Sequence, residues 1–366
     1  MRTLNYVVLA VLGLFFAACG SDDDHLGDWA KAPQFAGSGR LGAVSFVIGD
    51  MAYVGLGLGE KDQEFRDFWK FDYANGGTWT KVAEFPGRAR HGAVAFVLNG
   101  KAYVGTGYIM ATQTTVGESR PAEYLQDFYE YDPVTDTWTQ IQDYPVKCRD
   151  AVAFADPTGK AGYVGTGRGR NENDVDEIYK DFFKYVPGTG WSRLEGTSAF
   201  IGDKRYGATA FVVGGKAYVC LGTDNTYVRD VSMFDFATET WTAKGALTNK
   251  PDIDQDKDYD RIPRAYAVSF VSNKGFGKVE YAYIATGIGN NRRTTWRYNH
   301  VRDQWHQMED LSTYASDVVM AVGFTVGGYG FYTTGGSATD ASSSFTPYSN
   351  TWRFIPDAKE WRGNDY

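Results

Sequence analysis

A repeated unit is the feature of this sequence that most limits how the chain can fold. Its clearest copy, residues 90–138, opens with two short runs of alternating apolar and polar residues separated by Asn99-Gly100. That dipeptide is typical of the two-residue turn of a β-hairpin. A third run around Tyr129 and a fourth run starting at Trp138 are separated by a turn that contains Asp132-Pro133. One unit therefore predicts a four-stranded antiparallel sheet, whose strands are here named a to d in chain order.

Six copies of this unit align by their shared residues. Five of them open with an arginine before strand a, whereas the sixth opens with Ala315-Ser316-Asp317. The opening arginines are Arg40, Arg90, Arg149, Arg205 and Arg264, and the closing tryptophans on strand d are Trp79, Trp138, Trp191, Trp241, Trp305 and Trp361. The tryptophans recur at intervals of roughly 50 to 64 residues, which indicates one repeated architecture rather than two unrelated domains.

The repeat resembles the kelch repeat, which has an opening arginine, a glycine at the end of strand b, an aromatic residue on strand c and a tryptophan on strand d. The resemblance covers residues 28–366 and implies an all-β fold, a six-bladed β-propeller with four-stranded antiparallel blades. The glycine pair of the family is present only as Gly335-Gly336. The first three units place the first glycine one residue earlier, as in Gly105-Thr106-Gly107.

An additional tryptophan, Trp29, lies before the first strand a, in a segment that aligns with the end of the first unit. Propellers avoid exposed sheet edges by letting a terminal strand complete the last blade. We therefore expect the strand around Trp29 to close the ring in blade six. Trp361 offers the same blade a strand d, so the sequence leaves open which terminus closes it.

The N-terminus, residues 1–18, is typical of a secretory signal peptide and is too short for a membrane span. Phe16-Ala17-Ala18-Cys19 resembles the lipobox of bacterial lipoproteins, which implies a lipid on Cys19; an ordinary signal peptide is the alternative. The acidic tether, residues 19–27, resembles an export tag. It implies an outer-membrane lipoprotein at the cell surface, with a plain spacer and a periplasm-facing protein as alternatives.

Charge and cysteine content limit the partners. The net charge is −8, from 37 basic and 45 acidic residues, which argues against nucleic acid or an anionic membrane surface. We therefore expect contact with a membrane only through the lipid anchor. An oxidising compartment permits a disulfide between Cys148 and Cys220, but the repeat places them in neighbouring blades, and two buried thiols are the favoured interpretation.

The functional face is predicted from the direction of the strands. Strand a runs from one face of the propeller to the other and strand b returns, so the start of strand a and the end of strand b lie on the same face. Most lengthened loops follow or precede these positions, which indicates a binding surface. These loops are residues 108–126, 168–180, 250–263, 290–293 and 337–350.

The opening arginines are the candidate ligand contacts. In kelch propellers the matching arginines often line the channel mouth, and the resemblance implies the same for Arg40, Arg90, Arg149, Arg205 and Arg264. Guanidinium groups suit carboxylates and sulfates, and Tyr108 and Tyr227 lie where a sugar ring could stack on them. The alternative is that each arginine bridges to its neighbouring blade through carbonyls or acids, because a residue found once per repeat is more often scaffold than site.

No metal or cofactor site is predicted. Asp252, Asp254, Asp256, Asp258 and Asp260 alternate as calcium ligands do, but Lys257 and Pro263 stand where a calcium loop requires glycine and a bidentate acid, so a solvated acidic loop is favoured. The four histidines do not show metal-ligand spacing. The copper ligands of galactose oxidase, which also contains a kelch propeller, find no counterpart.

The sequence therefore favours a binding module over an enzyme: a surface lipoprotein whose propeller binds a glycan or a protein. The alternative is a sugar epimerase or mutarotase acting on an acidic sugar, because sialic acid epimerases are also six-bladed kelch proteins. That alternative rests on analogy of fold alone.

Overall fold

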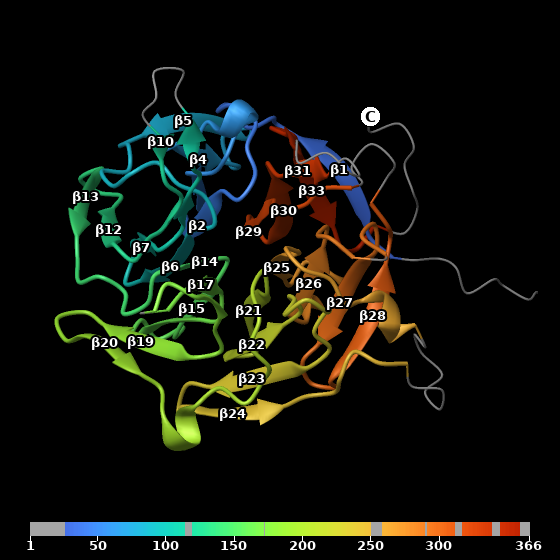
Figure 1. Cartoon of the computed structure of the whole chain (residues 1–366). Helices are drawn as coiled ribbons and strands as arrows, with labels where there is room; N and C mark the ends of the chain where they lie inside the picture. The colour runs from blue at the N-terminus through green and yellow to red at the C-terminus, as the bar shows by residue number, and fades with distance from the viewer. Residues whose placement is uncertain are drawn as a thin grey trace, which may run out of the picture.

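The computed structural model describes residues 26–113, 119–171, 173–249, 258–289, 291–311, 317–338 and 345–358. Within these residues, six four-stranded antiparallel sheets stand around a central axis (Figure 1). The predicted all-β, six-bladed propeller is thereby confirmed. Each blade begins at the axis with strand a and ends at the periphery with strand d.

The first three blades follow the chain without interruption of strand order. Blade one contains β2 (Val44–Ile48), β3 (Met51–Gly55), β4 (Phe68–Asp72) and β5 (Thr78–Val82). Blade two contains β6 (Val94–Leu98), β7 (Lys101–Gly105), β12 (Phe128–Asp132) and β13 (Thr137–Gln140). Blade three contains β15 (Val152–Ala155), β16 (Gly162–Gly165), β19 (Phe182–Val186) and β20 (Gly190–Arg193).

Blades four and five also contain four consecutive long strands, whereas blade six includes one strand from the N-terminal end of the chain. Blade four contains β21 (Thr209–Val213), β22 (Lys216–Cys220), β23 (Val231–Asp235) and β24 (Thr240–Ala243). Blade five contains β25 (Val268–Ser272), β26 (Tyr281–Ala285), β27 (Thr295–Asn299) and β28 (Gln304–Met308). Blade six contains β29 (Val322–Val326), β30 (Tyr329–Thr333), β33 (Thr351–Ile355) and, outermost, β1 (Asp28–Ala32).

Short strands in the lengthened loops form small additional sheets. They are β8 (Tyr108–Ile109) with β11 (Glu123–Tyr124), β9 (Thr112–Gln113) with β10 (Ser119–Arg120), β14 (Cys148–Arg149) with β17 (Arg168–Arg170) and β18 (Asp176–Ile178), and β31 (Gly336–Ala338) with β32 (Phe345–Pro347). Single 3-10 turns occur at η1 (Glu60–Asp62), η2 (Gly196–Ser198), η3 (Tyr259–Arg261) and η4 (Phe276–Lys278).

The N-terminal strand closes blade six, as expected. Trp29 on β1 lies opposite Phe354 on β33, the same pairing that joins Trp79 to Phe71 in blade one. Trp138, Trp191, Trp241 and Trp305 occupy the matching register in blades two to five. Trp29 thus takes the place in blade six that the sequence alignment also offered to Trp361, which lies outside the described residues.

Hydrogen bonds between neighbouring blades link the whole ring. In each blade the amide of the glycine two residues after the end of strand b donates to the carbonyl of the residue that opens the next blade. The pairs are Gly57 to Arg90, Gly107 to Cys148, Gly167 to Arg205, Gly222 to Arg264, Gly287 to Val318 and Gly335 to Arg40. The last bond connects blade six to blade one. A Cβ at Gly107, whose φ is +111°, would lie 3.0 Å from the His91 carbonyl oxygen, so glycine suits this close approach.

The hydrophobic core lies between blades, because each sheet buries the alternate residues of its strands against the next sheet. In blade two, Phe96 of strand a stacks on Tyr103 of strand b at 5.1 Å, and both rings pack against Tyr185 of blade three. Cys148 and Cys220 are buried free thiols, which confirms the expectation of two unpaired cysteines.

Several sequence predictions fall outside the described residues. They are the signal peptide, Cys19, and Asp252, Asp254 and Asp256 of the acidic loop. In the described part of the chain, no group of three or more acidic, histidine or cysteine side chains is arranged to hold a metal ion. That part also contains no helix long and apolar enough to cross a membrane.

Candidate functional site

The start of strand a and the end of strand b do meet on one face. The residue after the opening position forms a bridge with the third residue after strand b in five blades: Leu41 with Leu58, His91 with Tyr108, Tyr206 with Thr223, Ala265 with Ile288, and Val319 with Gly336. In blade three the corresponding contact is a regular pair, Arg149 with Arg168. These residues surround the channel mouth.

Four of the five opening arginines do not line this mouth, contrary to the prediction. Arg40, Arg90, Arg205 and Arg264 have no exposed surface. Arg90 shows the arrangement: its Nε donates to the Arg88 carbonyl at 2.8 Å, and its Nη atoms hold both carboxylate oxygens of Asp127 at 2.5 and 2.7 Å. Arg40 and Arg205 form the same pairs with Asp67 and Asp230. These arginines lie inside the blade, where their charge is satisfied, so they are scaffold.

Arg264 is buried in the same way but forms no ion pair with an aspartate among the described residues. Its Nη atoms donate to the backbone carbonyl of Thr294 at 2.9 Å and to the Oγ1 of the same residue at 2.5 Å. Burial lowers the pKa of Arg264 to about 10, although the charge of Asp310 partly opposes this shift. Among the described residues, the hydrogen bonds of this guanidinium go to carbonyl and hydroxyl oxygens.

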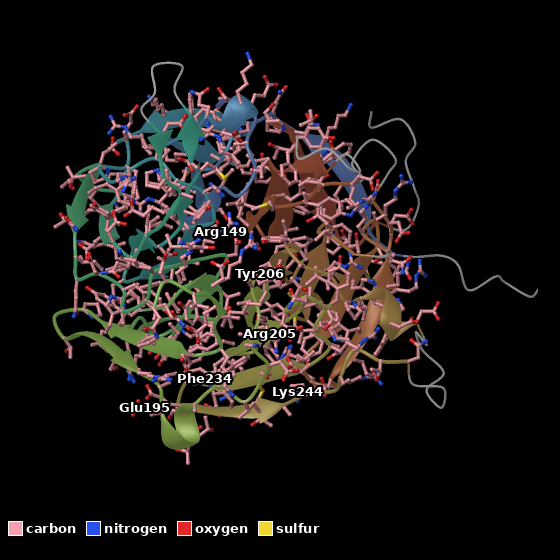
Figure 2. All side chains as sticks on the ribbon, in the orientation of Figure 1. Arg149, Glu195, Arg205, Tyr206, Phe234 and Lys244 are labelled. Atoms are coloured by element: carbon pink, nitrogen blue, oxygen red, sulfur yellow. The ribbon has the colours of Figure 1, made fainter. Side chains whose placement is uncertain are left out.

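Arg149 is different because the opening position of blade three belongs to Cys148. The carbonyl of Cys148 accepts the inter-blade bond that the carbonyls of Arg40, Arg90, Arg205 and Arg264 accept in the other blades. Arg149 is therefore the next residue, equivalent to His91 and Leu41, and its side chain reaches the channel mouth. Figure 2 shows Arg149 and Tyr206 close to the centre of the ring, and Glu195 and Lys244 far from it.

Two arginines lie side by side at the mouth. Arg149 on β14 pairs directly with Arg168 on β17, and like charges in this position are unfavourable unless something opposes them. Asp150 does so in part: its Oδ2 lies 3.5 Å from the Nε of Arg149 and 3.3 Å from the Nε of Arg168. Neither Nε forms a hydrogen bond with a residue that the structure describes, although both atoms are buried. The guanidinium groups rest on aromatic rings, Arg149 on Tyr108 at 4.2 Å and Arg168 on Tyr206 at 4.4 Å.

A chain of hydrogen bonds orients Arg149. Its Nη1 lies 2.9 Å from the Nε2 of His91, whose Nδ1 lies 3.2 Å from Glu64. Because arginine only donates, Nε2 accepts, and the ring proton lies on Nδ1 and is donated to Glu64. The Met110 amide donates to the same carboxylate oxygen at 2.8 Å. His91 and Glu64 are almost fully buried, at 3% and 4% side-chain exposure, so this chain forms a fixed support behind Arg149.

Backbone strain concentrates at the same place. Asp150 and Tyr266 have φ values of 57° and 58°, in the left-handed region, where blades one, two and four have glycine. Such a conformation is unusual for a bulky residue and is kept only where the surroundings impose it. Here the Tyr266 hydroxyl donates to Asp150 at 3.0 Å, and the amides of both residues donate to carbonyls of neighbouring blades. The strain places a carboxylate and a phenol beside the two arginines.

A cavity of about 290 Å³ opens at this mouth. Its polar lining includes Asp62, His91, Arg149, Arg168 and Tyr266, and its apolar lining includes Leu41, Leu58, Ile288, Val319, Met320 and Phe345. Tyr108, a predicted ligand contact, does not line this cavity but lies beneath Arg149. Tyr227, the other predicted aromatic contact, is half-buried and does not line it either.

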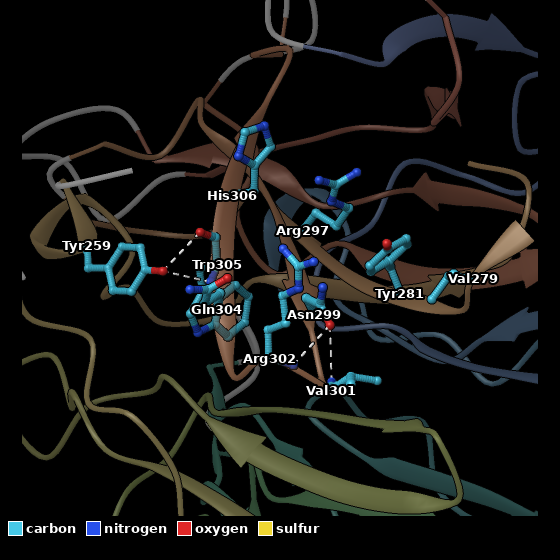
Figure 3. Close-up of a pocket in the computed structure, with 10 residues that line it drawn as sticks. All are labelled: Tyr259, Val279, Tyr281, Arg297, Asn299, Val301, Arg302, Gln304, Trp305 and His306. Carbon is cyan, nitrogen blue, oxygen red and sulfur yellow. Dashed lines mark hydrogen bonds between the residues drawn. The ribbon is translucent and has the colours of Figure 1, made fainter. Parts of the chain in front are cut away.

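Other cavities lie elsewhere on the propeller. The first residues of the six strands a enclose about 220 Å³ along the channel. A cavity of 480 Å³ lies on the flank of blade five (Figure 3), where the Trp305 amide donates to the Tyr259 hydroxyl at 2.9 Å. Arg297, Arg302 and His306 line it, next to the turn between β27 and β28. This turn is on the face opposite the lengthened loops, so we place the functional site at the channel mouth.

Comparison with known proteins agrees with the fold. A family model of the kelch motif matches residues 204–245, which span blade four. The chain is a β-propeller that carries a kelch motif in its fourth blade. The family model of N-acetylneuraminate epimerase matches residues 33–184. The solved structure of YjhT superimposes with a TM-score of 0.62 at 17% sequence identity, over 87% of this chain and 95% of that one. No curated protein sequence matches.

Sequence reasoning missed Arg168, His91, Glu64, Asp150 and Tyr266. The residues of the blade-three opening, Cys148-Arg149-Asp150, carried the signal. The other arginine-bearing units read Arg40-Leu41-Gly42, Arg90-His91-Gly92, Arg205-Tyr206-Gly207 and Arg264-Ala265-Tyr266, so a shift by one residue places Arg149 and Asp150 at the second and third positions. That shift moves Arg149 out of the scaffold position and onto the mouth.

Proposed function

We propose that this propeller is a ligand-binding module whose channel mouth holds the carboxylate of an acidic sugar. The main observation in support of this proposal is the pair Arg149 and Arg168, whose side chains are 15% and 31% exposed. In the described part of the chain, the side chain of Arg168 donates no hydrogen bond, and that of Arg149 donates only to His91. Guanidinium donors held flat on aromatic rings and left unused suit two-point binding of a carboxylate.

The rest of the cavity supports a single sugar ring as the occupant. Its volume of about 290 Å³ is at the small end for ligand pockets. Apolar side chains such as Ile288 and Phe345 face the hydrophobic side of a ring, whereas Asp62 and Tyr266 offer partners to hydroxyl groups. A protein ligand would have to present one acidic side chain here, and the size of the cavity favours the sugar.

The test is calorimetric titration of the purified protein with N-acetylneuraminate, glucuronate and galacturonate. Each charge-assisted hydrogen bond contributes about 1.5 to 3 kcal/mol, so Arg149→Met and Arg168→Met are each expected to weaken binding by about tenfold or more. Arg302→Met, which removes an arginine from the flank cavity, is the matched control and is expected to bind as the wild type does. Equal affinity in all three variants would refute the proposal.

A second candidate is an epimerase or mutarotase for an acidic sugar. The observation that favours it is the match of the N-acetylneuraminate epimerase model to residues 33–184, a range that contains Glu64, His91, Arg149 and Arg168. Against it, the Nε2 of His91 already accepts a hydrogen bond from Arg149 and is not free to take a proton. Magnetic-resonance exchange between the two anomers of N-acetylneuraminate decides: faster interconversion with protein than without it identifies an enzyme.

We also propose that the propeller is held at the outer membrane, at the cell surface, through a lipid on Cys19. The support is the sequence Phe16-Ala17-Ala18-Cys19 and the acidic residues that follow it. Metabolic labelling with a palmitate analogue is expected to mark the wild type and not Cys19→Ser. Protease treatment of intact cells separates the surface location, where the propeller is accessible, from the periplasm-facing alternative.

A further inference from the structure

A second cavity lies beside the mouth and has a different charge balance. It measures about 410 Å³ and is lined by Tyr108, Tyr124, Lys147, Arg170 and Asn171, together with Ala122, Glu123, Asp174 and Asp176. Among its described lining residues, two basic and three acidic side chains give one net negative charge. A carboxylate is therefore not favoured there, whereas a neutral sugar with many hydroxyl groups finds both donors and acceptors.

The small sheet of blade three connects the two cavities. Its strands β14 and β17 pair Cys148 with Gly169 and Arg149 with Arg168. Since residues alternate between the faces of a strand, Arg149 and Arg168 share the outer face with Lys147 and Arg170, while the buried Cys148 and Gly169 face the core. Alternate residues lie about 7 Å apart along a strand, a distance comparable with one sugar residue.

Tyrosine rings lie at the boundary between the cavities. Tyr108 lines the second cavity, and its ring lies under the guanidinium of Arg149, which lines the first. Tyr124 packs on Tyr108 with ring centroids 4.8 Å apart. Burial raises the pKa of Tyr124, and the positive charges of Arg149 and Arg168 partly oppose that rise, which agrees with their proximity. Aromatic rings between two polar sites are suitable platforms for the apolar faces of sugars.

The small sheet of blade three is fixed by contacts of its own residues. Gly169 permits it, because a Cβ there would lie 2.0 Å from the Lys147 carbonyl oxygen and 3.1 Å from the Tyr179 ring. Arg170 is held by Asp174 at 3.0 Å and Asp176 at 3.2 Å. Lys147 is exposed and forms no side-chain hydrogen bond or ion pair with any described residue. The second cavity thus has a fixed frame and one unused cation.

We infer that the two cavities together bind a glycan in which an acidic sugar is linked to a neutral one. The acidic sugar lies at Arg149 and Arg168, and the neutral sugar lies against Tyr124 and Lys147. The charge balance determines which sugar occupies which cavity, since the net negative second cavity disfavours the carboxylate. This inference rests on the proposed function and adds that the ligand is an oligosaccharide end rather than a free acidic monosaccharide.

The experiment compares N-acetylneuraminate, 3′-sialyllactose and lactose by calorimetric titration of the full protein. The wild type is expected to bind sialyllactose at least tenfold more tightly than N-acetylneuraminate, and lactose weakly. Lys147→Ala and Tyr124→Ala are expected to lower the sialyllactose affinity to that of N-acetylneuraminate and to leave the latter unchanged. Tyr124→Phe keeps the ring and is expected to retain most of the gain, which excludes unfolding as the cause.

The outcomes separate the two proposals. Equal affinity of the wild type for sialyllactose and N-acetylneuraminate overturns the second subsite and leaves the mouth site standing. A gain for sialyllactose that survives both Lys147→Ala and Tyr124→Ala places the neutral sugar elsewhere and also overturns it. Absence of binding for all three ligands refutes the proposed function itself. Loss of both affinities in Arg149→Met, with Lys147→Ala affecting only sialyllactose, supports both proposals.

Discussion

The buried arginine of blade two provides a test of which arginines support the fold and which bind ligand. In Arg90→Met the apolar stem is kept and the guanidinium is removed. The substitution deletes two hydrogen bonds to Asp127 and two to the carbonyls of Arg88 and Thr106. Breaking a buried pair by removing one partner costs about 3 to 5 kcal/mol. The side chain of Asp127 is 22% exposed, so water recovers part of that loss, and a value near the lower limit is expected.

Urea unfolding followed by tryptophan fluorescence measures this effect. At a slope of about 3 kcal/mol per molar urea, a loss of about 3 kcal/mol lowers the midpoint by about 1 M. Arg90→Met/Asp127→Asn removes both charges and is expected to lose less than the sum of the single variants, because neither charge is then left unpaired. Arg149→Met serves as the comparison, with a midpoint close to that of the wild type. An unchanged midpoint in Arg90→Met, or a large decrease in Arg149→Met, would refute this division of the arginines.

Three other properties can be measured on the same protein. Burial, and secondarily the charge of Asp303, raises the pKa of Tyr218 to about 12. Because the unfolded state loses this proton from about pH 10, the free energy of unfolding should fall between pH 10 and 12. Tyr218→Phe should make this fall of the free energy with pH less steep. The buried thiols of Cys148 and Cys220, whose pKa values burial raises, should react with a disulfide reagent only after unfolding, so fast labelling of the native protein would contradict the structure. Trp29 is 2% exposed and donates from Nε1 to Thr295 at 3.0 Å, so Trp29→Ala should lower the free energy of unfolding by about 3 to 5 kcal/mol, whereas an exposed change such as Val134→Ala should not.

The repeat made the architecture readable from sequence because each blade repeats the same local pattern. The turn at Asn99-Gly100 and the register of Trp138 opposite Tyr131 both follow from that pattern. Closure by β1 was readable in part, since Trp29 matched strand d before any strand a had occurred, whereas Trp361 offered the same blade a strand d and left the choice of terminus open.

The candidate site was less readable because an alignment of repeats compares residue types, whereas burial depends on register. Arg149 aligned with the four scaffold arginines by type, but its position is one residue later, as the inter-blade hydrogen bond to the Cys148 carbonyl shows. Arg168 belongs to a segment without any repeated motif, and Tyr266 stands at a position of the repeat where three other units have glycine. Long-range contacts such as that of Tyr266 with Asp150, 116 residues apart, leave no local pattern in the sequence.

The closure of blade six has a consequence for the order of folding. Trp29 leaves the ribosome before any blade exists, yet its ring packs on Tyr332 and Phe354, and its indole bonds to a residue 266 positions away. Such distant pairing makes folding slow, because a large loop must close before the contact stabilises anything. Blades one to five are complete in themselves and provide neighbouring surfaces early, so the first strand to be synthesised is the last to find its place. Refolding of Trp29→Ala should therefore keep the early fluorescence phases of the wild type and alter only the final one.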